Sequence, residues 1–147
     1  MAIPKRVIIV DDHALVRAGL RRLLAEDPGI EIVGEAGNGR LAITEVGLLA
    51  PDLVLMDLAM PDMNGIKATL EIKQRYPEVR VLIMTMHNTI EYVQASLEAG
   101  ADGYVLKETE PEEFFAAIHS VLQGKRYLSN EVAAMAGTGA PGGSAPR

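Results

Sequence analysis

Three short apolar runs punctuate the chain, at residues 7–10, 53–56 and 81–84. Each consists of leucine, methionine or β-branched residues and lacks the alternation of apolar and polar positions that marks a half-exposed strand. Continuous runs of this kind are typical of parallel strands that helices cover on both faces. Two weaker runs, 30–35 and 103–106, are partly alternating or very short, which predicts strands at the edges of a sheet.

Stretches with helical spacing of apolar residues separate these runs. The stripes are Val16, Leu20, Leu23 and Leu24; Ala42, Val46 and Leu49; Ile66 and Leu70; Val93 and Leu97; and Phe114, Phe115, Ile118, Val121 and Leu122. Strand and helix therefore alternate five times, which predicts a doubly wound α/β fold with helices on both faces of a five-stranded parallel sheet. With the second and fifth strands at the edges, we expect the flavodoxin-like strand order 2-1-3-4-5.

Length and composition indicate one ordinary globular domain. The chain has 147 residues, of which 48% are hydrophobic and 23% charged, values close to those of an average domain. It has no cysteine, which excludes disulfides and thiolate metal sites. No segment approaches the roughly 18 apolar residues of a membrane span, so we expect a cytoplasmic protein without a membrane partner. A formal net charge of −6 argues against binding of nucleic acid by these residues.

The C-terminal part of the chain differs in composition from the rest. Residues 137–147 consist almost entirely of glycine, alanine, proline, serine and threonine, a composition typical of flexible linkers. We therefore expect a domain over residues 1–128 and a flexible linker over 129–147. A linker that joins nothing within the chain suggests that the output part of a longer protein follows it.

Polar residues follow four of the five predicted strands. Asp11 and Asp12 follow the first, Asp57 the third, Thr85 the fourth and Lys107 the fifth. Ligands of doubly wound sheets bind beyond the carboxyl ends of the strands, at the switch point flanked here by the first and third strands. We therefore expect three carboxylates, a hydroxyl and an ammonium group to converge there.

Such a cluster indicates metal-assisted phosphoryl chemistry. Three converging carboxylates repel one another, so removing one of them should stabilise the metal-free fold. Mg²⁺, or Mn²⁺ in its place, prefers oxygen ligands and commonly pairs one or two carboxylates with a phosphate. A carboxylate at such an ion, beside Lys107 and Thr85, can attack a phosphoryl group and form an acyl phosphate.

Over residues 5–128 the chain resembles the receiver domains of two-component response regulators, which have a CheY-like fold. Any one of the matching stretches is weak evidence, whereas all of them in order along five βα units are specific. These stretches are Val-Asp-Asp-His at 10–13, Met-Asp-Leu-Ala-Met-Pro-Asp-Met-Asn-Gly at 56–65, Thr85, and Tyr-Val-Leu-Lys at 104–107.

The resemblance implies a role for each residue of the cluster. Asp57 would be the phosphoacceptor. Asp12, Asp57 and the backbone carbonyl of Ala59 would bind Mg²⁺, while Asp11 would hold a metal-bound water. The ion and the acceptor would then share a single pocket.

Three further residues complete the set that the resemblance implies. Lys107 would contact the phosphoryl group. Thr85 and Tyr104 would report its presence, with Tyr104 filling space that opens when Thr85 is drawn inward. His87, two residues past Thr85, is a possible flanking residue, although an exposed loop position explains it equally well.

Finer features are similar to the NarL/FixJ branch, whose receivers precede a LuxR-type helix-turn-helix. They are Leu-Val-Arg-Ala-Gly-Leu at 15–20, Val-Gly-Glu-Ala at 33–36, Gly-Tyr-Val-Leu-Lys at 103–107 and Gly-Lys-Arg-Tyr-Leu-Ser at 124–129. The branch implies a sensor histidine kinase as phosphodonor and a homodimer on phosphorylation. It also implies DNA contact only through an output domain absent from this chain, and no catalysis beyond self-phosphorylation and slow autodephosphorylation.

Two positions depart from the common receiver pattern. Glu108 follows Lys107 where many receivers have proline, and Asn64 stands before Gly65 in place of the usual aspartate. The second change is mild because either side chain can cap a helix.

Other interpretations explain fewer of these residues. His13 is most simply the start of the first helix, and Arg17, Arg21 and Arg22 form a solvated face or, alternatively, a partner-binding face. A stand-alone receiver would not need the linker. A phosphatase of the haloacid dehalogenase type needs Asp-x-Asp after the first strand, and a nucleotide-binding domain needs a glycine-rich first turn; the chain has neither.

Overall fold

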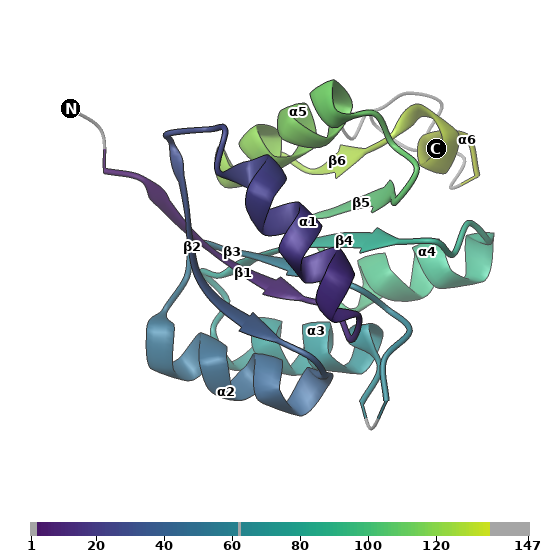
Figure 1. The fold of residues 1–147 in the computed structure, drawn as a ribbon. Coiled ribbons are helices and arrows are strands. Elements are labelled where there is room, and N and C mark those ends of the chain that lie inside the picture. Colours follow the sequence, from purple (N-terminus) through teal and green to yellow (C-terminus); the bar gives the residue numbers. More distant parts are fainter. Residues whose placement is uncertain (1–2, 62, 136–147) are drawn as a thin grey trace.

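The computed structural model describes residues 3–61 and 63–135. In this part of the chain six parallel strands form one sheet of order β2-β1-β3-β4-β5-β6 (Figure 1). The strands are β1 (Lys5–Val10), β2 (Ile30–Ala36), β3 (Leu53–Met56), β4 (Arg80–Thr85), β5 (Gly103–Leu106) and β6 (Tyr127–Leu128). The predicted order 2-1-3-4-5 is confirmed. The prediction that the fifth strand is an edge is wrong, because β6 pairs with it.

Helices cover both faces of the sheet, as the alternation of strands and helices predicts. They are α1 (Ala14–Leu24), α2 (Gly39–Leu49), α3 (Gly65–Arg75), α4 (Ile90–Glu98), α5 (Pro111–Leu122) and α6 (Asn130–Met135). Figure 1 shows α1 and α5 on one face of the sheet and α2, α3 and α4 on the other. None of the helices in the described part of the chain is long and apolar enough to span a bilayer.

Two hydrophobic clusters form the core, one on each face of the sheet. Ile8 and Val54 point to the α2–α4 side, and Ile9 and Leu55 point to the α1–α5 side. All four side chains are almost completely buried. Because successive strand residues alternate between faces, an uninterrupted apolar run is what a sheet covered on both sides requires.

One residue of the predicted helical stripes lies on the outer side of its helix. Leu70 is 42% exposed, whereas α3 buries Ala68, Thr69 and Ile72 completely. The helix therefore packs through Ala68, Thr69 and Ile72 together with the partly buried Ile66, whereas Leu70 lies on its outer side. Apolar spacing alone does not reveal this, because a two-residue stripe defines the angle of a helix face poorly.

The C-terminal segment is more ordered than the predicted linker. Residues 127–128 form β6, and α6 follows immediately, packing against α4 and β5. Val132 and Ala133 of α6 are buried together with Leu128. Residues 130–135, which the predicted linker includes, thus form a short helix that docks through one apolar pair. The remainder, 136–147, lies outside the described residues.

Candidate functional site

Three of the predicted site residues meet at the carboxyl ends of β1, β3 and β5. The Lys107 Nζ atom lies 2.8 Å from Oδ2 of Asp11 and 3.4 Å from Oδ2 of Asp57. Asp11 is completely buried and Asp57 is 3% exposed. Residues separated by up to 96 positions in the sequence are brought together because parallel strands end at the same edge of the sheet.

Asp57 is held directly beyond the last residue of β3. Its backbone N–H donates to the carbonyl of Val10 at 2.9 Å, which continues the pairing of β3 with β1. Its Oδ1 accepts a 2.8 Å hydrogen bond from the N–H of Leu58. Burial raises the pKa of Asp57; the positive charge of Lys107 opposes this, and the negative charge of Asp11 adds to it. The ionised carboxylate is therefore less stable here than at an exposed position. A group that neutralises its charge would stabilise it.

The loop after Asp57 folds back tightly on the strand end. The N–H of Gly65 donates to the carbonyl of Leu58 at 2.9 Å, and a Cβ atom on Gly65 would collide with the carbonyl oxygen of Asp57. Asn64 caps α3 by accepting a hydrogen bond from the N–H of Lys67 at 2.9 Å, as its sequence position predicts. Glycine is thus required at 65 by close approach of two backbone segments.

Asp11 has the opposite electrostatic setting from Asp57. Burial alone would raise its pKa, but hydrogen bonds from Lys107 and from the backbone N–H of His13 outweigh that effect and lower it. Burial likewise acts to lower the pKa of Lys107, and its pairs with Asp11 and Asp57 outweigh this and raise it. Asp11 and Lys107 therefore form a charged, mutually stabilised pair, with Asp57 at its side.

A potential cation site lies on the solvent side of this pair. Asp11, Asp12, His13 and Asp57 each offer one ligand atom, and these atoms all lie within 4.8 Å of one another. Three of the four are carboxylate oxygens, the donors that Mg²⁺ and Mn²⁺ prefer. The Asp12 side chain is 28% exposed, so the group can be reached from solvent. The donor set fits the predicted ion.

His13 and Ala59 stand beside this group in different ways. His13 is the N-cap residue of α1, as predicted, but its side chain makes no capping bond. Its Nδ1 instead lies 3.1 Å from Asp11 Oδ1 and 3.0 Å from Asp12 Oδ1, a contact that the sequence did not indicate. Ala59 lies two residues past Asp57 in the same loop, with its side chain exposed.

Thr85 and Tyr104 are joined through the backbone of His87. The N–H of His87 donates to Oγ1 of Thr85 at 3.2 Å, and the hydroxyl of Tyr104 donates to the carbonyl of His87 at 2.7 Å. Thr85 and Tyr104 are both completely buried, and burial raises the pKa of Tyr104, so its hydroxyl stays a donor. The His87 ring stacks on Tyr92 of α4 at 4.3 Å between centroids. The end of β4, β5 and α4 are thereby linked.

Two arginines that the sequence places on a solvated face have structural partners. Arg17 Nε and Arg21 Nε donate to the two carboxylate oxygens of Glu35 at 3.0 and 2.6 Å. Arg17 Nη1 also donates to the backbone carbonyl of Asp11 at 2.5 Å. The prediction of a solvated face is wrong for Arg17, whose side chain is 22% exposed and connects β2 to the acidic loop, whereas Arg21 is 49% exposed and fits that prediction.

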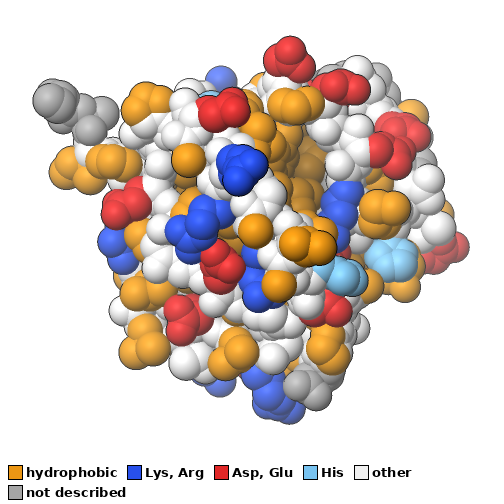
Figure 2. Space-filling model, viewed as in Figure 1, with side chains coloured by type: hydrophobic (Ala, Val, Ile, Leu, Met, Phe, Trp, Pro, Cys, Tyr) orange, Lys and Arg blue, Asp and Glu red, His pale blue; other side chains and the backbone are white. Residues whose placement is uncertain are grey.

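A small apolar hollow adjoins the site between α1 and α5. Figure 2 shows this hollow with hydrophobic side chains in its floor. It has a volume of about 90 Å³, and its lining residues are Leu20, Leu23, Met84, Leu106, Lys107, Thr109, Pro111 and Phe114. Lys107 thus separates the acidic cluster from an apolar wall.

Comparisons with known proteins agree on one family. The family model described as the response regulator receiver domain matches residues 7–119. The nitrate/nitrite response regulator protein NarL of Escherichia coli (strain K12) is 38% identical over 126 residues, which are 86% of this chain and 58% of NarL. The chain thus spans little more than half the length of the curated relatives that it matches.

Solved structures that superpose on this chain belong to the same family. A two-component response regulator of the LuxR family from Aurantimonas sp. SI85-9A1 superposes with a TM-score of 0.87 at 40% identity, covering 90% of this chain and 95% of the other. A structure described as two RcsB dimers bound to two parallel DNAs superposes with a TM-score of 0.83 at 28% identity, covering 90% of this chain and 68% of that one.

Proposed function

This chain belongs to the response regulator receiver domain family, in its NarL/FixJ branch, and we propose that Asp57 accepts a phosphoryl group from a sensor histidine kinase. The observation that supports this most strongly is the position of Asp57. It is a buried carboxylate with a raised pKa, beside a lysine at 3.4 Å and within reach of further acidic ligands. An aspartate with a purely structural role does not need a raised pKa together with a neighbouring lysine and further acidic ligands.

The chemistry requires a nucleophilic oxygen and neutralised charge. An Asp57 oxygen forms the new bond to phosphorus while the P–N bond of the phosphohistidine breaks, and its electron pair returns to the imidazole nitrogen. Lys107 neutralises charge on the phosphoryl oxygens, because its ammonium already stands beside the acceptor carboxylate. Transfer of this kind depends mostly on positioning and electrostatics. We do not expect turnover beyond slow loss of the phosphoryl group.

Asp12, Asp57 and the Ala59 carbonyl would hold Mg²⁺ or Mn²⁺, with Asp11 acting through a water. When bound, the ion supplies positive charge to the acidic cluster and to the phosphoryl oxygens. The carboxylate oxygens of Asp11, Asp12 and Asp57, which lie within 4.8 Å of one another, support this assignment. Asp11 already shares one oxygen with Lys107 and the other with His13, which favours an indirect role for it.

The acceptor assignment is tested by intact-protein mass. Treatment with acetyl phosphate and Mg²⁺ should add one phosphoryl group to the wild-type protein and none to Asp57→Asn. Asp52→Asn is a matched control, since Asp52 is also an aspartate beside β3 but at its opposite end. Labelling of Asp57→Asn to the wild-type extent would overturn the assignment.

The metal assignment predicts an order among the acids. Asp12→Asn should weaken Mg²⁺ binding more than Asp11→Asn does, because Asp12 is the direct ligand and Asp11 acts through water. Isothermal titration of both variants and of wild type measures this. An Asp12→Asn protein that binds Mg²⁺ as tightly as wild type contradicts the assignment.

We further propose that phosphorylation controls transcription through an output domain outside this chain, and that DNA contact is made by that domain. The net charge of −6 supports this division of roles. The chain's likeness to NarL and to RcsB, the latter described as dimers bound to DNA, supports pairing of receivers as the intermediate step. Thr85 and Tyr104, both tied to His87, are the proposed readout.

A further inference from the structure

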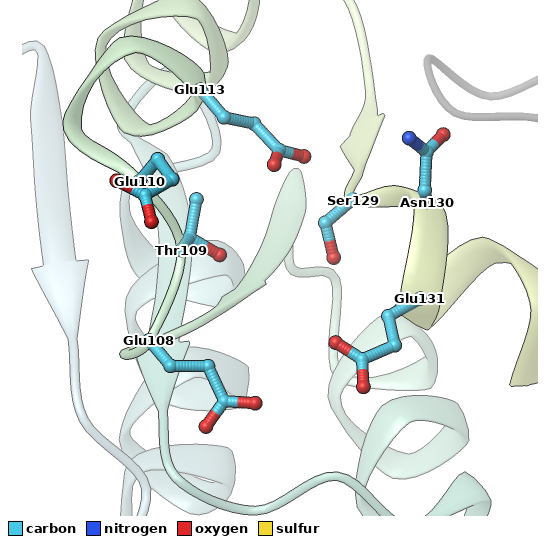
Figure 3. Close-up of a pocket in the computed structure, with 7 residues that line it drawn as sticks. All are labelled: Glu108, Thr109, Glu110, Glu113, Ser129, Asn130 and Glu131. Atoms are coloured by element: carbon cyan, nitrogen blue, oxygen red, sulfur yellow. The ribbon is translucent and has the colours of Figure 1, made fainter.

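An acidic pocket beside the β5–α5 loop is lined by none of the residues of the Asp57 site. It has a volume of about 520 Å³ and is formed by that loop, the start of α5 and the start of α6 (Figure 3). Its lining residues are Glu108, Thr109, Glu110, Glu113, Ser129, Asn130 and Glu131. Four carboxylates thus surround one hollow, and no basic side chain lines it.

The carboxylates of this pocket have no cationic partner within the described residues. No lysine, arginine or histidine of the ranges 3–61 and 63–135 forms an ion pair with any of the four. Glu113 accepts a 3.0 Å hydrogen bond from the hydroxyl of Tyr127. Burial, together with this glutamate, raises the pKa of Tyr127 to about 12. A neutral donor therefore fixes the Glu113 carboxylate without cancelling its charge.

An independent feature points to a ligand in this pocket. Ser129 is 4% exposed, and its Oγ has no hydrogen-bond partner in the described part of the chain. Figure 3 shows its hydroxyl turned toward the hollow, between the side chains of Glu113 and Glu131. Burial of a hydroxyl without a partner is unfavourable. A polar group that enters the pocket would satisfy it.

Helix ends account for part of the acidic character but not for all of it. Glu113 and Glu131 lie in the first turns of α5 and α6, where negative charge is favoured by the helix dipole. Glu108 precedes both helices. Ser129 is the residue directly before α6, and its carbonyl accepts a 2.7 Å hydrogen bond from the N–H of Ala133, but its hydroxyl makes no capping bond. The pocket therefore has features that local helix stability does not require.

The spacing of the acids favours an organic cation over a metal ion. In the described residues, the group of His, Cys, Asp and Glu side chains close enough to share an ion is the one around Asp57, and it contains none of these glutamates. A guanidinium is larger, planar and rich in N–H donors, and it pairs well with several carboxylates and a neutral oxygen at once. A cavity of this volume accommodates a side chain of that size.

We propose that this pocket binds an arginine side chain of a partner protein. The guanidinium is held among the carboxylates of Glu108, Glu113 and Glu131 and donates a hydrogen bond to Ser129 Oγ. Because Glu108 directly follows Lys107, the partner docks beside the loop that carries the lysine of the Asp57 site. The proposal concerns a separate pocket and does not depend on phosphorylation of Asp57.

Nuclear magnetic resonance titration with Nα-acetyl-arginine amide tests this on the whole chain. We expect saturable shifts concentrated at the amides of 108–110, 112–113 and 129–131. Nα-acetyl-citrulline amide, which has nearly the same shape without the charge, should bind at least tenfold more weakly. Equal shifts with citrulline, or shifts spread over all acidic surfaces of the molecule, would overturn the proposal.

Variants separate the pocket from general attraction to an acidic protein. The double variant Glu108→Gln/Glu131→Gln should weaken arginine binding at least tenfold, and Ser129→Ala should weaken it severalfold. The double variant Glu91→Gln/Glu98→Gln removes the same charge from α4, outside the pocket, and should bind as wild type does. Equal loss in both double variants would show a nonspecific charge effect and overturn the assignment, as would equal affinity for Nα-acetyl-lysine amide.

Discussion

Asp11 and Asp57 are neighbouring buried aspartates that differ in their distance from the ammonium group of Lys107. Lys107 lies 0.6 Å closer to Asp11, from 2.8 against 3.4 Å, and Asp11 also receives the His13 N–H. The pKa of Asp11 is lowered as a result, while burial, with a contribution from Asp11, raises the pKa of Asp57. The folded state thus favours ionised Asp11 and disfavours ionised Asp57 at neutral pH.

Opposite effects on stability follow from this difference. In metal-free protein at pH 7, Asp57→Asn should raise the melting temperature, because a neutral amide keeps the bond from Leu58 and removes a charge that burial disfavours. Asp11→Asn should lower it, because Lys107 loses its nearest partner in a buried setting. Circular dichroism melts with a chelator measure both. If both variants melted at a higher temperature than wild type, the prediction of opposite effects would be wrong. The sequence-based expectation, that removing either acid stabilises the metal-free fold, would then hold.

Site residues at strand ends were predictable from the sequence, whereas their supports were not. Asp57 and Lys107 terminate recognisable apolar runs, and the topology of a parallel sheet then brings them together. The link between Thr85 and Tyr104 runs through backbone atoms of His87, which carry no sequence signal. Arg17 reaches Glu35 and the Asp11 carbonyl through a long side chain, and helical spacing cannot distinguish such a residue from a solvated one.

At the scale of elements, α1 is attached to the sheet by few buried residues. Leu24, at its last position, is its one buried side chain. Leu20 and Leu23 pack against the core while partly exposed, and the ion pairs of Arg17 and Arg21 with Glu35 of β2 add to this attachment. Burial would raise the pKa of Glu35, but hydrogen bonds from Arg21 and Arg17 outweigh it and lower the pKa. Ionised Glu35 is thus favoured by folding.

Glu35→Gln should destabilise the protein by about 1 kcal/mol at pH 7, because partly exposed ion pairs contribute about 0.2–1 kcal/mol each. A lowered pKa in the folded state contributes stability that is complete above the unfolded pKa of about 4.3. That stability is lost as pH falls from there through the lower folded value. Urea unfolding at pH 7 and pH 3.5 should therefore show a smaller difference between variant and wild type at the lower pH. A difference independent of pH contradicts the assigned role.

The elements themselves followed from the sequence wherever burial was complete. Five of the six strands and five of the six helices in the described residues were predicted, because a covered parallel sheet demands continuous apolar runs and amphipathic crossovers. In the predicted stripe of α3, Leu70 was misplaced, because Ala68, Thr69 and Ile72 form the buried contact in its place. β6 and α6 were missed because two residues of strand and one buried apolar pair lie below what periodicity can detect.

At the scale of the whole molecule, the C-terminal segment touches the proposed readout. The N–H of Ser129 lies 3.4 Å from the carbonyl of Tyr104, and α6 packs against both α4 and β5. Tyr104 is completely buried here, with its hydroxyl on the His87 carbonyl. A movement of Thr85 that shifts the His87 segment would therefore displace α4 through the ring stack with Tyr92, and α6 through Tyr104.

Such a movement should appear as a change in association between copies of the chain. Beryllofluoride with Mg²⁺, a mimic of the phosphoryl group, is expected to increase self-association, because it places new acceptor atoms near the Thr85 hydroxyl and biases one of two conformations. A swing from about 1:99 to 99:1 requires roughly 5.5 kcal/mol of differential binding, and a weaker bias gives partial dimerisation. Sedimentation velocity with and without the mimic measures this, with Asp57→Asn as the control that should not respond.

Thr85→Ala should bind the mimic yet associate less than wild type. If it associates equally, the signal leaves Asp57 by a route that does not use Thr85; if wild type itself stays monomeric with the mimic bound, receiver pairing is not the response of this chain.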